Sequence, residues 1–222
     1  MLPIISAYNE PNLLQSCVAQ ALAHTSDQVL IIDNSTNLES MKQISYMLPD
    51  PRILYFKPIG WSHGDVFNWA IGCFTEPLLF LDQDCLLLEK IEVPRCDLAG
   101  ELWPAFIDPL IKMPTAPRFH SSFVYVNPLK ARGIDCRDQV IDGVRYDTGA
   151  LLFKNIENRQ YLEQKSYFHG WCDSSGVYLK GLPDDVKDYS KRAKQAIEHL
   201  RLSEFPELSK KFKELRQKYI QI

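Results

Sequence analysis

Two aspartates, Asp82 and Asp84, stand two residues apart at the end of the apolar run 78–81. If the chain turns there, both carboxylates can face the same side. Carboxylate oxygens suit Mg²⁺ and Mn²⁺, which usually share their coordination sphere with substrate phosphates. The pair therefore predicts a divalent-cation site that would neutralise charge on a departing diphosphate. A solvated turn after a strand is the alternative that this spacing leaves open.

The elements that must position these aspartates alternate between two periodicities in the first third of the chain. Apolar runs predict four strands, at residues 3–6, 29–33, 53–56 and 78–82. Apolar residues at helical spacing predict helices between them, with Ser35 or Thr36 capping the second. This alternation predicts an α/β fold with a mostly parallel central sheet and helices on both faces. Ligands of such sheets bind beyond the carboxyl ends of the strands.

The second half of the chain has a less regular pattern. We expect an irregular, proline-rich stretch, a strand, a helix and a loop, at about 91–117, 119–126, 151–161 and 168–176 respectively. Residues 183–222 carry two apolar stripes at helical spacing and predict a C-terminal helical hairpin. The hairpin would pack on the domain or on a partner chain. Its excess of lysine and arginine also permits peripheral contact with an anionic membrane.

The bulk composition limits the classes of partner. The net charge of -3 gives no overall field that would attract nucleic acid. The six cysteines form no CxxC pair, and several lie in apolar runs, so we expect reduced thiols in a cytoplasmic protein. The first residues lack the pattern of a signal peptide, and no apolar run has the length of a bilayer span.

Four motifs occur in an order that is similar to that of a known enzyme family. They are Ser6-Ala7-Tyr8-Asn9-Glu10, Ile31-Ile32-Asp33-Asn34-Ser35, Asn68-Trp69-Ala70-Ile71-Gly72 and Phe80-Leu81-Asp82-Gln83-Asp84. This series resembles the landmarks of family 2 glycosyltransferases and of the wider GT-A fold, a Rossmann-like nucleotide-binding architecture. The chain departs from the family pattern at Ala70, where glycine is frequent, and at Phe67, where a basic residue is usual.

The resemblance implies a nucleotide-sugar site in the first ninety residues. Tyr8 and Glu10 would line the base and ribose, and Asp33 would hydrogen-bond the nucleobase unless it is a turn or cap residue. Asp65 and Asn68 would approach the ribose or hold the loop. Asp82 and Gln83 would lie beside the diphosphate of the donor.

The resemblance also implies catalytic residues in the second half. Asp147 lies where the family carries a general base before a helix, although a helix-cap role fits it equally; Asp173 is the reserve candidate. His169 would join Asp82 and Asp84 as a metal ligand, unless it is an ordinary loop histidine. Trp171 would stack on an acceptor sugar or belong to the core. Arg118, His120, Ser121 and Ser122 are weaker candidates for the acceptor side, and His63 has no supporting constellation.

Together these observations predict a glycosyltransferase that depends on Mn²⁺ or Mg²⁺. It would transfer a sugar from a nucleotide donor, UDP-linked by the resemblance, to a hydroxyl of a glycan, a lipid-linked molecule or a protein, with inversion. The expected domains are 1–182, divided into a nucleotide-sugar half (1–90) and an acceptor half (91–182), and the hairpin 183–222. The alternatives are a non-catalytic sugar-nucleotide-binding module and a sugar-nucleotide pyrophosphorylase; the latter usually opens with a glycine-rich loop, which Tyr8-Asn9-Glu10-Pro11 lacks.

Overall fold

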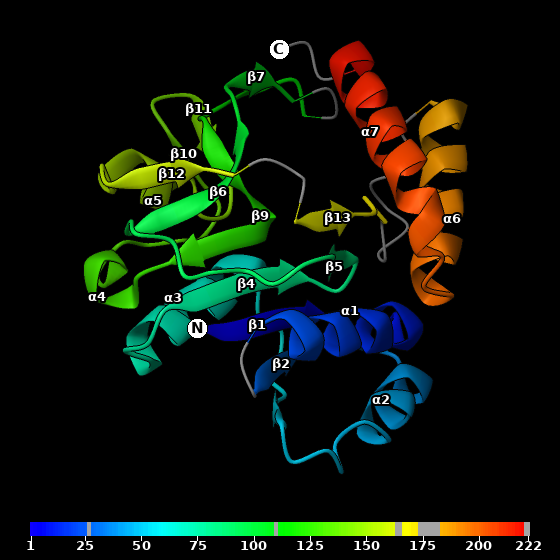
Figure 1. The fold of residues 1–222 in the computed structure, drawn as a ribbon. Helices are drawn as coiled ribbons and strands as arrows, with labels where there is room; N and C mark the ends of the chain where they lie inside the picture. Colours follow the sequence, from blue (N-terminus) through cyan, green and yellow to red (C-terminus); the bar gives the residue numbers. More distant parts are fainter. Residues whose placement is uncertain (26–27, 109–110, 163–165, 173–182, 220–222) are drawn as a thin grey trace.

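A seven-stranded sheet forms the centre of the protein in a computed structural model, which describes residues 1–25, 28–108, 111–162, 166–172 and 183–219 (Figure 1). In spatial order its strands are β12 (Arg159–Tyr161), β6 (Leu98–Trp103), β9 (Arg118–Val126), β4 (Leu78–Asp82), β1 (Leu2–Ala7), β2 (Val29–Asp33) and β3 (Ile53–Phe56). β4, β1, β2 and β3 are mutually parallel, β12 is parallel to β6, and β9 is antiparallel to both of its neighbours. The expected α/β architecture with a mostly parallel sheet is thus confirmed.

The central strands are buried on both faces, which explains their continuous apolar runs. Alternate residues of β1 face different sides: Ile5 packs into one core cluster and Ile4 into the other. Leu79 and Phe80 of β4 divide in the same way. Because side chains alternate along a strand, one apolar run supplies both cores.

Helices cover both faces of the sheet. They are α1 (Pro11–His24), α2 (Leu38–Ser45), α3 (His63–Cys73), α4 (Pro128–Ala131), α5 (Ala150–Asn155), α6 (Asp184–Glu198) and α7 (Phe205–Tyr219), with a short 3-10 turn at Leu202–Glu204. Residues of α3, α4 and α5 share the core cluster of one face. Residues of α1, α2, α6 and α7 share the cluster of the other face.

The described part of the chain also forms two smaller sheets. A two-stranded antiparallel sheet joins β5 (Cys85–Leu87) to β13 (Tyr167–His169), so a late segment of the chain lies beside the segment that follows β4. A four-stranded sheet contains β10 (Gln139–Ile141), β11 (Val144–Tyr146), β8 (Pro114–Thr115) and β7 (Phe106–Ile107).

The order of the parallel strands places a crevice at the carboxyl ends of β1 and β4. The chain runs from β1 outward to β2 and β3, and then returns to place β4 on the other side of β1. In the register of this pair, Ser6 lies opposite Asp82. A reversal of strand order of this kind is where open α/β sheets bind ligands.

The C-terminal hairpin, α6 and α7, buries its apolar stripes in the main core. Val186, Ala193, Leu208 and Leu215 are each at most 1% exposed and belong to the same cluster as Ile5 of β1. Of the interpretations that the sequence left open, packing on the domain agrees with this burial. No helix in the described part of the chain is long and apolar enough to cross a membrane.

Several sequence-based expectations were wrong in their local details. Asn37, rather than Ser35 or Thr36, caps α2, because its side chain accepts hydrogen bonds from the backbone N–H of Glu39 and Ser40. The stretch 91–117 contains β6, whose pairing with β9 overrides its weak strand propensity.

The expected helix at 151–161 is a six-residue helix followed by a strand. α5 ends at Asn155, and β12 then pairs with β6 at the edge of the sheet. The expected loop at 168–176 overlaps β13 at Phe168 and His169. These residues form a strand because they pair with β5, although the local sequence shows no strand pattern. Its remainder from Asp173 lies outside the described residues.

The stacking of α3 on β4 predicts a large loss of stability for Phe80→Ala. The Phe80 ring lies 3.8 Å from that of Phe67 at an interplanar angle of 11°, and Phe80 is 1% exposed. We expect a loss of about 3–5 kcal/mol in the free energy of unfolding, measured by urea denaturation. Leu38→Ala is the control, because Leu38 is 81% exposed. Equal losses for both variants would contradict the packing described here.

Candidate metal and nucleotide site

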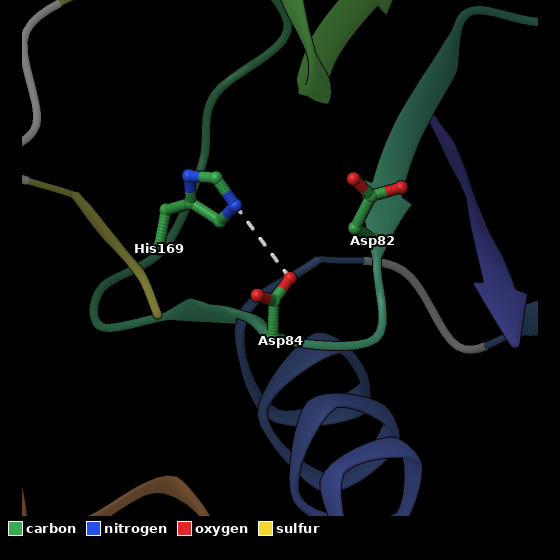
Figure 2. Close-up of side chains that lie close together, drawn as sticks. All are labelled: Asp82, Asp84 and His169. Carbon is green, nitrogen blue, oxygen red and sulfur yellow. Dashed lines mark ion pairs between the residues drawn. The ribbon is translucent and has the colours of Figure 1, made fainter. Parts of the chain in front are cut away.

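Three potential metal ligands converge at the crevice between β1 and β4. Figure 2 shows the carboxylates of Asp82 and Asp84 and the imidazole of His169 turned toward one space. One ligand atom from each side chain lies within 4.8 Å of the other two. The sequence-based prediction that these three residues come together therefore agrees with the geometry.

The elements around the cluster fix Asp84 and His169 relative to each other. β13 pairs with β5 so that His169 lies opposite Cys85, the residue after Asp84. The backbone N–H of Gly170 donates to the carbonyl of Asp84 (3.0 Å), and that of Cys172 donates to Asp84 Oδ2 (2.6 Å). Oδ1 of Asp84 then faces His169 Nε2 at 3.6 Å.

Ser122 of β9 connects the other two ligands. Its hydroxyl donates to Asp82 Oδ2 (2.6 Å) and lies 3.0 Å from His169 Nε2. Because a hydroxyl carries one proton, this arrangement makes Nε2 the donor to Ser122. Coordination of a cation uses the lone pair of Nε2, so the imidazole would carry its proton on Nδ1 when a metal is bound.

The electrostatics of the cluster suit a cation. Burial raises the pKa of the Asp84 carboxyl and the neighbouring charge of Asp82 adds to the rise, while His169 opposes it. The ligand atoms of one octahedral Mg²⁺ lie at most about 4.2 Å apart, twice the usual metal–oxygen distance. At most one pair among three ligands can be opposite, and adjacent ligands lie about 3 Å apart, so the side chains would need to move inward to share one ion. The donor set and its geometry fit Mg²⁺ or Mn²⁺.

A cavity of about 900 Å³ opens over this cluster. That volume is at the upper end of the range for pockets that hold drug-sized ligands. One wall comes from the loops after β1, β2 and β3. The other wall comes from β6, β9 and two strands of the four-stranded sheet, β7 and β11. Its lining includes Tyr8, Asn34, Lys57, His63, Asp82, Gln83, Asp84, Trp103, Asp108, Arg118, His120, Ser121, Ser122, Arg145, Asp147, His169 and Trp171.

Tyr8 and Gln83, both expected beside the nucleotide, lie together in the cavity wall. The amide of Gln83 accepts from the backbone N–H of Tyr8 (2.8 Å) and donates to its carbonyl (2.9 Å). Both hydrogen bonds fix the loop after β1 to the turn after β4. The Gln83 amide is thus engaged with the chain itself, and its contact with a ligand stays a prediction.

Asp33 and Glu10 are not among the residues that line the cavity. Asp33 is fully buried, and its carboxylate accepts from the Tyr55 hydroxyl (2.8 Å) and from the backbone N–H of Ser35 (2.8 Å). Glu10 forms an ion pair with Lys194 of α6 (2.7 Å). Their predicted contacts with the base and ribose remain predictions, and the structure gives each a stabilising partner within the protein.

Asp65 and Asn68 also lie outside the lining of the cavity. Asp65 forms a reciprocal capping box with Ser62 at the start of α3. The Asn68 side chain donates to Asp135 Oδ1 (2.8 Å) and accepts from the backbone N–H of Cys136 (2.8 Å). For Asn68 this geometry agrees with the loop-holding alternative that the sequence left open.

Asp147 lies in the second wall, within a group of alternating charges. Arg118 Nη2 contacts Asp147 Oδ2 at 2.7 Å, and Arg145 Nη2 lies 3.7 Å from Oδ1. Arg145 also pairs with Asp108 (3.2 Å) and with Asp138 (2.6 Å). Asp147 faces the cavity, and the two guanidinium groups fix its orientation. Asp173 lies outside the described residues.

Several cavity residues were missed or undervalued by the sequence analysis. His63, which had no supporting constellation in the sequence, lies in the lining with Nε2 3.7 Å from Asp82 Oδ1. Lys57, Asn34 and Trp103 also line the cavity. The position of Lys57 directly after a strand, at the carboxyl edge of the sheet, was the available signal for it.

His120, one of the weaker candidates in the sequence, is part of the cavity wall. Burial lowers the pKa of His120 well below its usual range, so its imidazole is neutral at neutral pH. Its ring lies 4.3 Å from that of Trp103 and 4.9 Å from that of His169. A neutral ring next to His169 avoids a second positive charge beside the proposed cation.

Comparison with known proteins finds distant structural similarity. No protein-family model and no curated protein matches the chain. One similar structure is GlyE of Streptococcus pneumoniae TIGR4, a glycosyltransferase, at 11% identity over 91% of this chain and 63% of that chain, with a TM-score of 0.47. A second is the galactosyltransferase LgtC in complex with donor and acceptor sugar analogues, at 12% identity over 87% of this chain and 83% of that chain, with a TM-score of 0.48. A third is S. aureus TarS 1–349 in complex with UDP, at 12% identity over 75% of this chain and 59% of that chain, with a TM-score of 0.48. The chain spans less than two thirds of the length of GlyE and TarS.

Repulsion between the Asp82 and Asp84 carboxylates predicts how Asp84→Asn changes the stability of the protein and its response to Mn²⁺. We expect wild-type protein to gain about 2.7 kcal/mol of unfolding free energy with Mn²⁺ at one hundred times its dissociation constant. The variant should lose this gain. Without metal it should be at least as stable as wild type at neutral pH, because a desolvated charge has been removed.

Thermal unfolding with and without Mn²⁺ measures both effects. Asp184→Asn is the matched control, because the Asp184 side chain is 94% exposed and lies in α6, where it should leave the metal response intact. A metal response of Asp84→Asn equal to that of wild type would exclude Asp84 as a ligand.

Proposed function

We propose that this protein is a metal-dependent glycosyltransferase that uses a nucleotide-sugar donor and a hydroxyl acceptor. The observation that carries the proposal is the convergence of Asp82, Asp84 and His169 at the strand-order reversal, beneath a cavity of about 900 Å³. A divalent cation held there would supply positive charge to a leaving diphosphate. UDP is the nucleotide to test first, given the sequence resemblance.

The two walls of the cavity divide the binding tasks. The loops after β1, β2 and β3 contribute Tyr8, Asn34 and Lys57, next to the carboxyl ends of the parallel strands where nucleotides bind in such folds. The opposite wall contributes Arg118 and Asp147. We therefore assign the donor to the first wall and the acceptor to the second.

Asp147 is the residue that we propose accepts the proton of the acceptor hydroxyl. The acceptor oxygen forms a bond to the anomeric carbon, the bond from that carbon to the diphosphate breaks, and the proton passes to the Asp147 carboxylate. Arg118 holds Oδ2 at 2.7 Å, and the backbone N–H of Thr148 donates to Oδ1 at 2.8 Å, so the carboxylate has a fixed orientation. Direct displacement of this kind inverts the anomeric configuration.

Ser122 is a positioning residue in this scheme. Its hydroxyl donates to Asp82 and lies against His169, so it sets the separation of two metal ligands. Trp171 lines the cavity beside them, and we propose that its ring stacks on the apolar face of the acceptor sugar.

The proposed reaction predicts release of a nucleoside diphosphate from a nucleotide sugar when Mn²⁺ is present. Incubation of the protein with UDP-glucose, UDP-galactose and UDP-N-acetylglucosamine, with UDP release measured by a coupled assay, tests this. Chelation of the metal should abolish release, and Asp184→Asn should leave it unchanged. Binding of a donor without release under any of these conditions would favour a non-catalytic nucleotide-sugar-binding module instead.

Asp147→Asn separates donor binding from transfer. Removal of a general base costs about 10²–10⁴-fold in rate, so transfer to the acceptor should fall by that factor while the dissociation constant for UDP changes little. Calorimetry and product analysis measure the two quantities. Full transfer activity in this variant would exclude the proposed base.

A further inference from the structure

The C-terminal hairpin lies directly behind the proposed metal ligands. Figure 1 shows α6 and α7 beside β13, the strand that ends in His169. The Phe212 ring of α7 meets the imidazole of His169 edge-on, at 5.9 Å and 75°. It meets Trp171 in the same way, at 5.4 Å and 80°. One fully buried ring thus contacts a proposed metal ligand and a residue of the cavity wall.

α6 restricts the same segment from a second direction. A Cβ added to Gly170, the residue after His169, would lie 2.5 Å from Cδ1 of Ile197. A side chain at this position would therefore displace the helix or the segment. The Tyr189 hydroxyl donates to the carbonyl of His169 at 3.5 Å, and the Tyr189 ring packs on Phe212 at 6.0 Å.

A shared carboxylate ties α7 to the strand of His169. Arg216, one turn after Phe212, pairs with Glu101 of β6 and donates to the carbonyl of Leu102 (2.8 Å). The Tyr167 hydroxyl donates to the other carboxylate oxygen of Glu101 (2.7 Å). Glu101 therefore fixes both α7 and the residue two positions before His169.

We propose that Phe212 is a positioning residue for the metal site and that the hairpin is an integral part of that site. The inference rests on the proposed function, since it takes the cluster as a metal site. His169 contributes one of three ligands, and its ring contacts both Ser122 and Phe212. Hydrogen-bonding partners that orient a metal-binding histidine typically alter metal affinity by about 10–100-fold when they are changed, and we expect an effect at the lower end of that range for a ring that packs on the imidazole.

The chain offers a matched control on the same helix. Phe205 is also 1% exposed, and its ring stacks on Phe168 at 4.4 Å, next to His169 in sequence. The side chain of Phe168 points to the opposite side of β13 from that of His169, because side chains alternate along a strand. Phe205→Leu therefore removes an equivalent buried ring without touching the His169 imidazole.

Mn²⁺ titration followed by the EPR signal of free Mn²⁺ tests the proposal without any substrate. Phe212→Leu should weaken Mn²⁺ binding by about 10-fold or more, while Phe205→Leu binds Mn²⁺ as wild type does. Thermal unfolding of the metal-free variants should show similar losses of stability. Equal Mn²⁺ affinities for the two variants would overturn the positioning role.

Three further outcomes are decisive. If Phe212→Leu does not fold, Phe212→Met replaces it, because methionine keeps most of the buried volume and removes the ring; unchanged Mn²⁺ affinity in that variant would overturn the proposal. If wild type itself binds no Mn²⁺, the metal site and this inference both fail. Mn²⁺ binding by wild type and Phe212→Leu with equal affinity removes this inference and leaves the proposed function standing.

Discussion

The constraint on which the site depends is the placement of two carboxylates at the end of a buried strand. Asp82 ends β4, whose apolar residues are covered by helices on both faces, and Asp84 is only 5% exposed. Charges removed from water in this way repel each other and cost free energy unless a partner offsets them. His169, Ser122 and the backbone N–H of Cys172 satisfy part of that demand, and a divalent cation would satisfy the rest.

The remaining polar residues near the carboxyl edge form a scaffold around these carboxylates. Gln83 holds the loop after β1 through Tyr8, and the Asn9 side chain accepts from the backbone N–H groups of Thr36 and Asn37 (both 3.0 Å). Asp33 is hydrogen-bonded internally to the end of β3 through Tyr55. The first three parallel strands are thus joined at their carboxyl ends by side chains, which gives the donor wall a fixed shape before any ligand arrives.

The sequence predicted the elements whose signal is local. β1, β2, β3 and β4 are continuous apolar runs. Asp82 and Asp84 could be predicted as metal ligands because they lie at the carboxyl end of the last of these runs. β6 was missed because Gly100 and Glu101 interrupt its apolar pattern. Gly100 has no room for a Cβ beside Phe119, and Glu101 bridges Tyr167 and Arg216. These reasons depend on tertiary neighbours.

The same distinction between local signals and tertiary contacts explains which residues of the candidate site could be predicted from the sequence. His169 was identified through its resemblance to a family landmark, whereas His63 has no sequence signal and reaches Asp82 only because α3 begins at the rim of the cavity. Asp147 was identified by its position before a helix, but its pairing with Arg118 depends on the contact between β9 and the segment after β11. The role of the hairpin could not be predicted either, because an amphipathic pattern does not identify the surface that it covers.

The proposed site requires a cation that the cluster and a nucleoside diphosphate share. Calorimetric titration of UDP into wild-type protein, with Mn²⁺ and then with a chelator, tests this most directly. We predict that UDP binds with Mn²⁺ and that its affinity falls at least tenfold, about 1.4 kcal/mol, when the metal is removed. Asp82→Asn should show the weaker affinity under both conditions. Equal affinity of wild type for UDP with and without metal, or no binding of UDP in either condition, would contradict the account.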